Sequence, residues 1–112
     1  MRPFLVRQMI EDILTLCWSI KEVNRNLSDR KATSDFSINY LKKACIELAM
    51  EMREQGKSRP NETLEVIDKK GHKEKIVLTK VSEMLHDARL IMEFNLIDNI
   101  SRWAREQQVE FK

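Results

Sequence analysis

Glycine and proline are scarce in this sequence, with two of each among 112 residues. Both residues interrupt regular structure, because glycine supplies the positive φ angles of tight turns and proline breaks helices. Loops that surround a phosphate group need several glycines, so that the backbone can approach the ligand closely. The composition therefore excludes a glycine-rich phosphate loop and favours long helices.

Residues that bind zinc are equally few, with two cysteines and two histidines in the chain. Cys17 and Cys45 show no C-x-x-C spacing, and we expect two reduced thiols inside a hydrophobic core. Glu83 and His86 form an E-x-x-H pair, which can bind a metal in helical bundles when other helices add glutamates. This pair falls on the polar side of its predicted helix, so we predict no metal site and no cofactor.

Long hydrophobic runs are absent from the sequence as well. No stretch approaches the roughly 20 apolar residues of a membrane span, and charges interrupt the opening MRPFLVRQMIEDIL too early for a signal peptide. The chain holds 20 basic and 18 acidic residues, a net charge of +2 that does not require a polyanionic partner. We expect a cytoplasmic (intracellular) protein that does not associate with membranes.

Two amphipathic helices are predicted in the first half of the chain, over residues 3–27 and 36–56. The second has apolar residues at alternating spacings of three and four, which predicts one buried face; these are Ile38, Leu41, Cys45, Leu48 and Met52. In the first helix, Leu14 and Trp18 lie at the edge of the polar side. Either another helix of the same chain covers this pair, or it forms an interface, where tryptophan is enriched.

One β-hairpin is predicted over residues 62–80, because TLEVID and KIVLTK alternate in hydrophobicity on either side of KKGHKE. Several pairings around Gly71 place the apolar residues equally well, so the register stays open. The hairpin is rich in basic side chains that could contact phosphates, as in a winged-helix protein: Lys69, Lys70, His72, Lys73 and Lys75. A solvated turn protected by lysines against aggregation explains the same pattern.

A last helix is predicted over residues 81–108, with apolar side chains on more than one face. Such a helix needs partners on two sides, and a second copy of the chain is the economical source. A broken helix that folds back on its own domain is the alternative. We therefore predict a homodimer, with these interface residues on the first and last helices: Leu14, Trp18, Leu90, Phe94, Ile97 and Trp103.

The sequence as a whole predicts a single domain over residues 1–112, mainly α with one β-hairpin (α-α-β-β-α) and a long C-terminal helix. It contains no G-x-S-x-G motif, and no histidine lies close in sequence to either cysteine. We predict a non-enzymatic interaction or regulatory protein that acts as a homodimer and binds a protein partner through helix faces. The alternative is a nucleic-acid-binding regulator that uses the basic hairpin.

Overall fold

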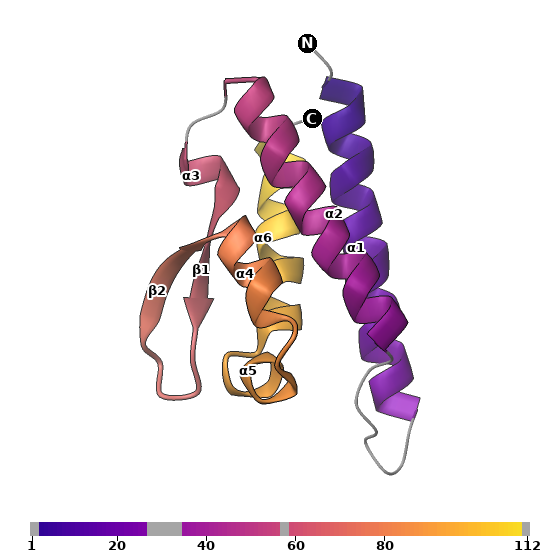
Figure 1. Cartoon of the computed structure of the whole chain (residues 1–112), viewed down its shortest axis with the longest axis vertical. Helices are drawn as coiled ribbons and strands as arrows, with labels where there is room; N and C mark the ends of the chain where they lie inside the picture. Colours follow the sequence, from indigo (N-terminus) through magenta and orange to yellow (C-terminus); the bar gives the residue numbers. More distant parts are fainter. Residues whose placement is uncertain (1–2, 27–34, 57–58, 111–112) are drawn as a thin grey trace.

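The computed structural model describes residues 3–26, 35–56 and 59–110 (Figure 1). The elements in chain order are α1 (Pro3–Asn26), α2 (Asp35–Glu54), α3 (Arg59–Glu62), β1 (Thr63–Ile67), β2 (Lys73–Val77), α4 (Leu78–Met84), α5 (Ala88–Glu93) and α6 (Leu96–Glu110). The predicted fold class is confirmed, because the chain is mainly helical with one antiparallel hairpin and ends in a long helix. The predicted end of the first helix, residue 27, lies outside the described residues.

Helices α1 and α2 run antiparallel and pack side by side (Figure 1). The apolar positions predicted for the second helix are all buried, as the alternating spacing requires: Ile38, Leu41, Cys45, Leu48 and Met52. The end of α2 also follows the sequence. Gly56 has a φ of 71° and its N–H donates to the carbonyl of Arg53 at 3.0 Å, the left-handed cap that glycine adopts without steric cost.

Strands β1 and β2 pair in one register, with Leu64 opposite Ile76 and Glu65 opposite Lys75. Leu64 and Val66 point into the core and are buried, which confirms the predicted apolar face of the first strand. The segment KSRPNE, which shows no helical pattern in the sequence, contains the single turn of α3 just before β1.

The segment predicted as one helix over residues 81–108 is divided into three helices. The first of them begins at Leu78, within the predicted hairpin 62–80, so the bounds of both elements are corrected. Helix α5 begins anew after Asp87, whose side chain accepts a hydrogen bond from the Arg89 N–H at 2.9 Å. It ends before Asn95, which has a left-handed φ of 53°. The Asn99 side chain then donates to the carbonyls of Phe94 at 2.8 Å and Asn95 at 3.2 Å, which satisfies two carbonyls at the break.

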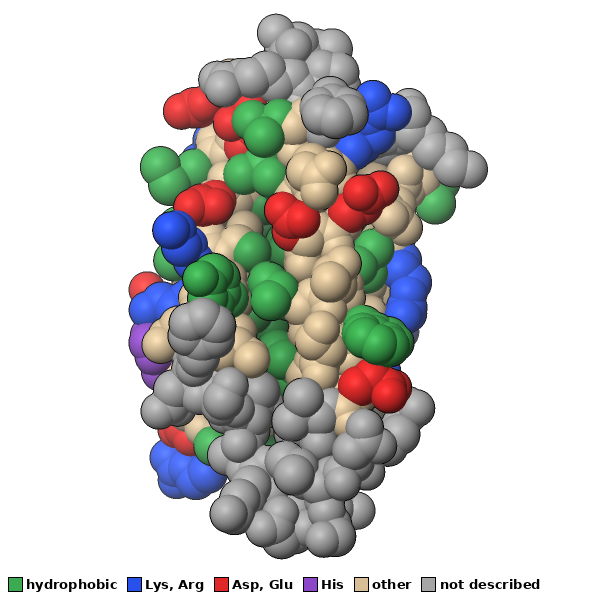
Figure 2. Space-filling view, turned by 90° about the vertical axis from the view of Figure 1, so that its right-hand side faces the viewer, with side chains coloured by type: hydrophobic (Ala, Val, Ile, Leu, Met, Phe, Trp, Pro, Cys, Tyr) green, Lys and Arg blue, Asp and Glu red, His purple; other side chains and the backbone are tan. Residues whose placement is uncertain are grey.

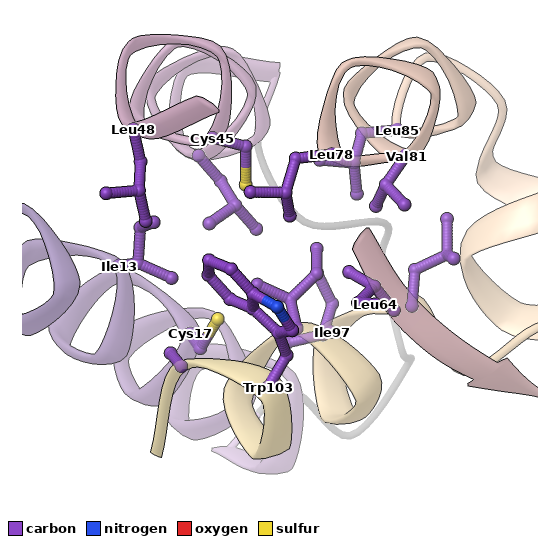
Figure 3. Packing of buried hydrophobic residues seen from close by; sticks show 14 of the residues in the cluster. Ile13, Cys17, Cys45, Leu48, Leu64, Leu78, Val81, Leu85, Ile97 and Trp103 are labelled. Carbon is purple, nitrogen blue, oxygen red and sulfur yellow. The ribbon is translucent and has the colours of Figure 1, made fainter. Parts of the chain in front are cut away.

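Trp103 of α6 extends into the middle of the core, between residues of α1 and α2 (Figure 3). Helix α6 packs against α1 on one side and against β1 on the other. The folding back of α4, α5 and α6 therefore closes the core within one chain. None of the helices over 3–26, 35–54 and 59–110 is long and apolar enough to cross a membrane.

Candidate interaction surfaces

Trp18 is the largest side chain left uncovered on α1, with 64% of its surface exposed. Leu14, one turn earlier, is half-buried and packs against the core. Neighbouring helices of the same chain therefore cover the leucine in part and leave the tryptophan in solvent. Burial of an indole ring is strongly favourable, so an exposed tryptophan beside a hollow is typical of a binding surface.

The hollow lies between α1 and α6 and has a volume of about 430 Å³. We call its lining the Trp18 surface, which consists of Leu14, Trp18, Lys21, Glu22, Ser101, Arg105 and Gln108. Lys21 Nζ is 2.6 Å from Asp98 Oδ1, so the lysine that lines the hollow also joins α1 to α6 in an ion pair. Both of its side chains are nearly half exposed, so this pair positions charge at the rim more than it stabilises the fold.

Figure 2 shows the α1 side of the molecule. Hydrophobic side chains lie there in small separate groups, acidic side chains lie among them in the upper half, and basic side chains lie along the margins. The part of this face that is not drawn in grey lacks the continuous apolar layer of an obligate interface. A partner on this side would meet a few apolar anchors within a polar surround.

The remaining predicted interface residues do not share the exposure of Trp18. Trp103 is 2% exposed and Ile97 is 8% exposed, so both belong to the chain's own core and are corrected as surface residues. Leu90 is half-buried, and Phe94 packs against the same core. The prediction of one continuous helix places them outside its main apolar stripe, but the breaks at Asp87 and Asn95 turn them inward.

The turn of the hairpin is built by one carboxylate. Asp68 Oδ1 accepts the backbone N–H groups of Lys70 and His72, each at 2.9 Å, and the Gly71 N–H donates to the Asp68 carbonyl at 3.0 Å. Gly71 has a φ of 85°, the left-handed conformation that follows a tight turn in hairpins of this kind. Asp68 and Gly71 together select the register that hydrophobic alternation leaves open.

The same contacts determine the ionisation of Asp68. Partial burial opposes its charge, but hydrogen bonds from the backbone of His72 and Lys70 hold the pKa of the carboxyl below its ordinary value of 3.8. The carboxylate also lies 3.3 Å from Nδ1 of His72. Negative charge is therefore fixed within the basic turn.

The predicted phosphate contacts are all on the surface of the hairpin, where Lys69, Lys70, His72, Lys73 and Lys75 are exposed. Asp68 and Glu74 lie among them and reduce the local charge. The helices before the hairpin are α1 and α2, of 24 and 20 residues, and the single turn of α3. Among the described elements, no pair of short helices joined by a tight turn precedes the hairpin, so nucleic-acid binding stays a prediction that depends on these lysines alone.

Both free thiols are buried in the core, Cys17 on α1 and Cys45 on α2 (Figure 3). Burial raises the pKa of Cys17 to about 12. Burial, with a smaller effect of the neighbouring Cys17, also raises the pKa of Cys45 above its ordinary value. Both thiols stay protonated at neutral pH, and a protonated thiol is a poor nucleophile and a poor metal ligand.

Glu83 and His86 each contact a lysine side chain. A hydrogen bond joins His86 Nε2 to Lys42 Nζ of α2, and Glu83 Oε2 is 3.4 Å from Lys80 Nζ. Within the described part of the chain, no three His, Cys, Asp or Glu side chains are grouped so as to hold a metal ion.

One contact at the sheet could not be expected from sequence patterns. The Arg102 guanidinium of α6 donates to the backbone carbonyl of Glu65 in β1. It therefore uses the outer edge of β1, the edge that faces away from β2. Any polar side chain could serve such a carbonyl, so no sequence signal identifies Arg102 in this role.

Comparison with known proteins returned no matching family, no similar curated protein and no similar solved structure.

Proposed function

We propose that the protein is a non-enzymatic interaction protein that forms a homodimer through the Trp18 surface and binds a further protein partner. The observation that supports this best is the exposure of Trp18 beside the hollow between α1 and α6. Protonated, buried thiols also argue against cysteine-based catalysis.

The energy available at this surface is sufficient for a weak contact. With 64% of Trp18 exposed, a partner would remove roughly 150 Å² of it from water, which at ~25 cal/mol per Å² amounts to about 4 kcal/mol before the costs of association. Leu14, at the wall of the hollow, would add a smaller apolar contact. A symmetric dimer buries Trp18 and Leu14 of both copies, so the favourable free energy of burial is doubled.

A second copy is the occupant that the charges favour. In a two-fold contact the same patch meets itself, so its rim must hold both signs of charge. The Trp18 surface does so, with Lys21 and Glu22 on α1 and Arg105 on α6. The net charge of +2 opposes the association of two copies only weakly.

Sedimentation velocity over a range of protein concentrations tests this proposal. We expect a reversible monomer–dimer equilibrium, and Trp18→Ala should weaken it at least about 30-fold, because a central aromatic anchor contributes ~2 kcal/mol or more. Met92→Ala is the matched control, since Met92 on α5 is also 64% exposed but lies outside the Trp18 surface. A monomer at all concentrations, or equal effects of the two substitutions, would contradict the proposal.

A further inference from the structure

Strand β2 is the outermost element on its side of the molecule (Figure 1). Its first three residues, Lys73, Glu74 and Lys75, are exposed, whereas β1 is covered by α3 and α6. A two-stranded sheet has two outer edges, and the two edges of this sheet differ.

The register determines which backbone groups point outward. Asp68 N–H donates to the His72 carbonyl at 3.0 Å, so these two residues form a hydrogen-bonded pair. Hydrogen-bonded and non-hydrogen-bonded pairs alternate along an antiparallel ladder. The next pair, Ile67 with Lys73, and the pair Glu65 with Lys75 are therefore non-hydrogen-bonded, and their N–H and C=O groups point away from the partner strand.

The two outer edges then have different environments. On β1, Arg102 donates to the outward carbonyl of Glu65, which agrees with the alternation. On β2, no backbone or side-chain group among the described residues bonds to the outward N–H and C=O groups of Lys73 and Lys75. These four groups match one edge of an added strand.

A second copy of the chain does not suit this edge. In an antiparallel pairing, outward residues must face outward residues. Two-fold registers of β2 with itself then place Lys73 opposite Lys73, Lys75 opposite Lys75, or Lys73 opposite Lys75, and the last of these also places Glu74 opposite Glu74. The register that avoids this would need Val77, which is the N-cap of α4 and whose carbonyl starts that helix. Like charges directly opposite each other destabilise a ladder.

The charges of the edge indicate the complementary partner. Lys73 and Lys75 point to the same face of the strand, because side chains alternate with a period of two. Glu65 lies opposite Lys75, whereas Lys73 lies opposite the uncharged Ile67. We infer that the β2 edge binds an extended segment of a partner protein by strand addition, and that this segment has carboxylates at alternate positions facing the two lysines.

This inference does not depend on the proposed dimer. The β2 edge lies on the opposite side of the molecule from α1 (Figure 1). A dimer formed through the Trp18 surface would leave both copies of the edge open, and a monomer would bind the same segment. Failure of the dimer therefore leaves strand addition intact, and failure of strand addition leaves the dimer intact.

Amide hydrogen exchange with a designed peptide gives the first test. The probe is a short peptide of alternating glutamate and valine, with a lysine–valine peptide as its control. We expect the amides of Lys73 and Lys75 to exchange rapidly in the free protein and to become protected by the acidic peptide. The ladder amides of Glu74 and Ile76 should be protected in both states. Unchanged exchange at Lys73 and Lys75 at saturating acidic peptide would overturn the inference.

Charge-reversal substitutions at two places in the hairpin distinguish strand addition from non-specific electrostatic attraction between an acidic peptide and the lysines. Lys73→Glu with Lys75→Glu should weaken binding of the acidic peptide by about tenfold or more, since two favourable cross-strand pairs become repulsive. Lys69→Glu with Lys70→Glu changes the same charge at the tip of the turn and should change affinity by less than about threefold. Equal losses in the two double variants would show attraction to charge alone and would overturn the inference.

A proline substitution tests the backbone contact itself. Lys75→Pro removes one outward N–H, and the ladder does not use this group, so we expect the variant to keep the fold. We expect this variant to lose binding to the same extent as the charge-reversed edge. Full affinity in a folded Lys75→Pro protein would contradict strand addition, and the exchange experiment on the unaltered chain decides the matter if this variant does not fold.

Discussion

The two tryptophans of this chain occupy opposite environments. Trp103 on α6 is 2% exposed and lies at the centre of the core, whereas Trp18 on α1 is 64% exposed beside the hollow. The sequence predicts both as interface residues, since each lies on a helix whose apolar residues extend beyond one face. An apolar residue outside the main apolar stripe of a helix can therefore be buried by another element of the same chain, as Trp103 is. It marks an exposed surface only where no such element packs against it, as at Trp18.

The largest expected difference between the surroundings of Trp103 and Trp18 is in how much each side chain contributes to the free energy of unfolding. Trp103→Ala should lower the free energy of unfolding by about 3–5 kcal/mol, because it removes a large core side chain and leaves a cavity. Trp18→Ala should change it by less than about 0.5 kcal/mol in the monomer. Urea denaturation at low protein concentration measures both values. Similar losses in the two variants would show that Trp18 is part of the core.

A smaller effect is expected at the break that brings Trp103 inside. Asn95 has a φ of 53°, and this conformation costs roughly 1 kcal/mol for a residue with a Cβ atom, less for asparagine and least for glycine. Asn95→Ala should therefore destabilise the fold by about 1 kcal/mol, and Asn95→Gly should be neutral or slightly stabilising. Equal destabilisation by both would indicate that the asparagine side chain, rather than its backbone conformation, supports the break.

Hydrophobic periodicity predicts those helices whose apolar residues follow a single helical repeat along one face. The buried face of α2 follows from its spacing, and its end follows from Gly56. The segment 81–108 could not be predicted from periodicity, because its apolar residues are frequent enough to resemble a continuous helix with two faces. Asp87 and Asn95 are residue types that favour helix starts and left-handed ends, so a search for caps inside the pattern would have indicated the breaks.

The candidate surfaces are less accessible to sequence reasoning. Leu14 and Trp18 are identified because they are apolar residues at the edge of the polar side of α1, but their exposure depends on where α6 packs. The free edge of β2 depends on the ladder parity, which Asp68 and Gly71 establish through the turn. Arg102 engages the other edge through a tertiary contact that joins residues 37 positions apart. Such contacts have no local signature.

The central claim is that Trp18, and not Trp103, becomes buried when two copies associate. Tryptophan fluorescence tests it most directly in a pair of single-tryptophan proteins. In Trp103→Phe the emission comes from Trp18, and in Trp18→Phe it comes from Trp103. We predict that Trp18 emission shifts to shorter wavelength as protein concentration rises through the dimer range, while Trp103 emission stays constant at short wavelength. Emission from Trp18 that stays at the wavelength of an exposed indole at every concentration would contradict the account.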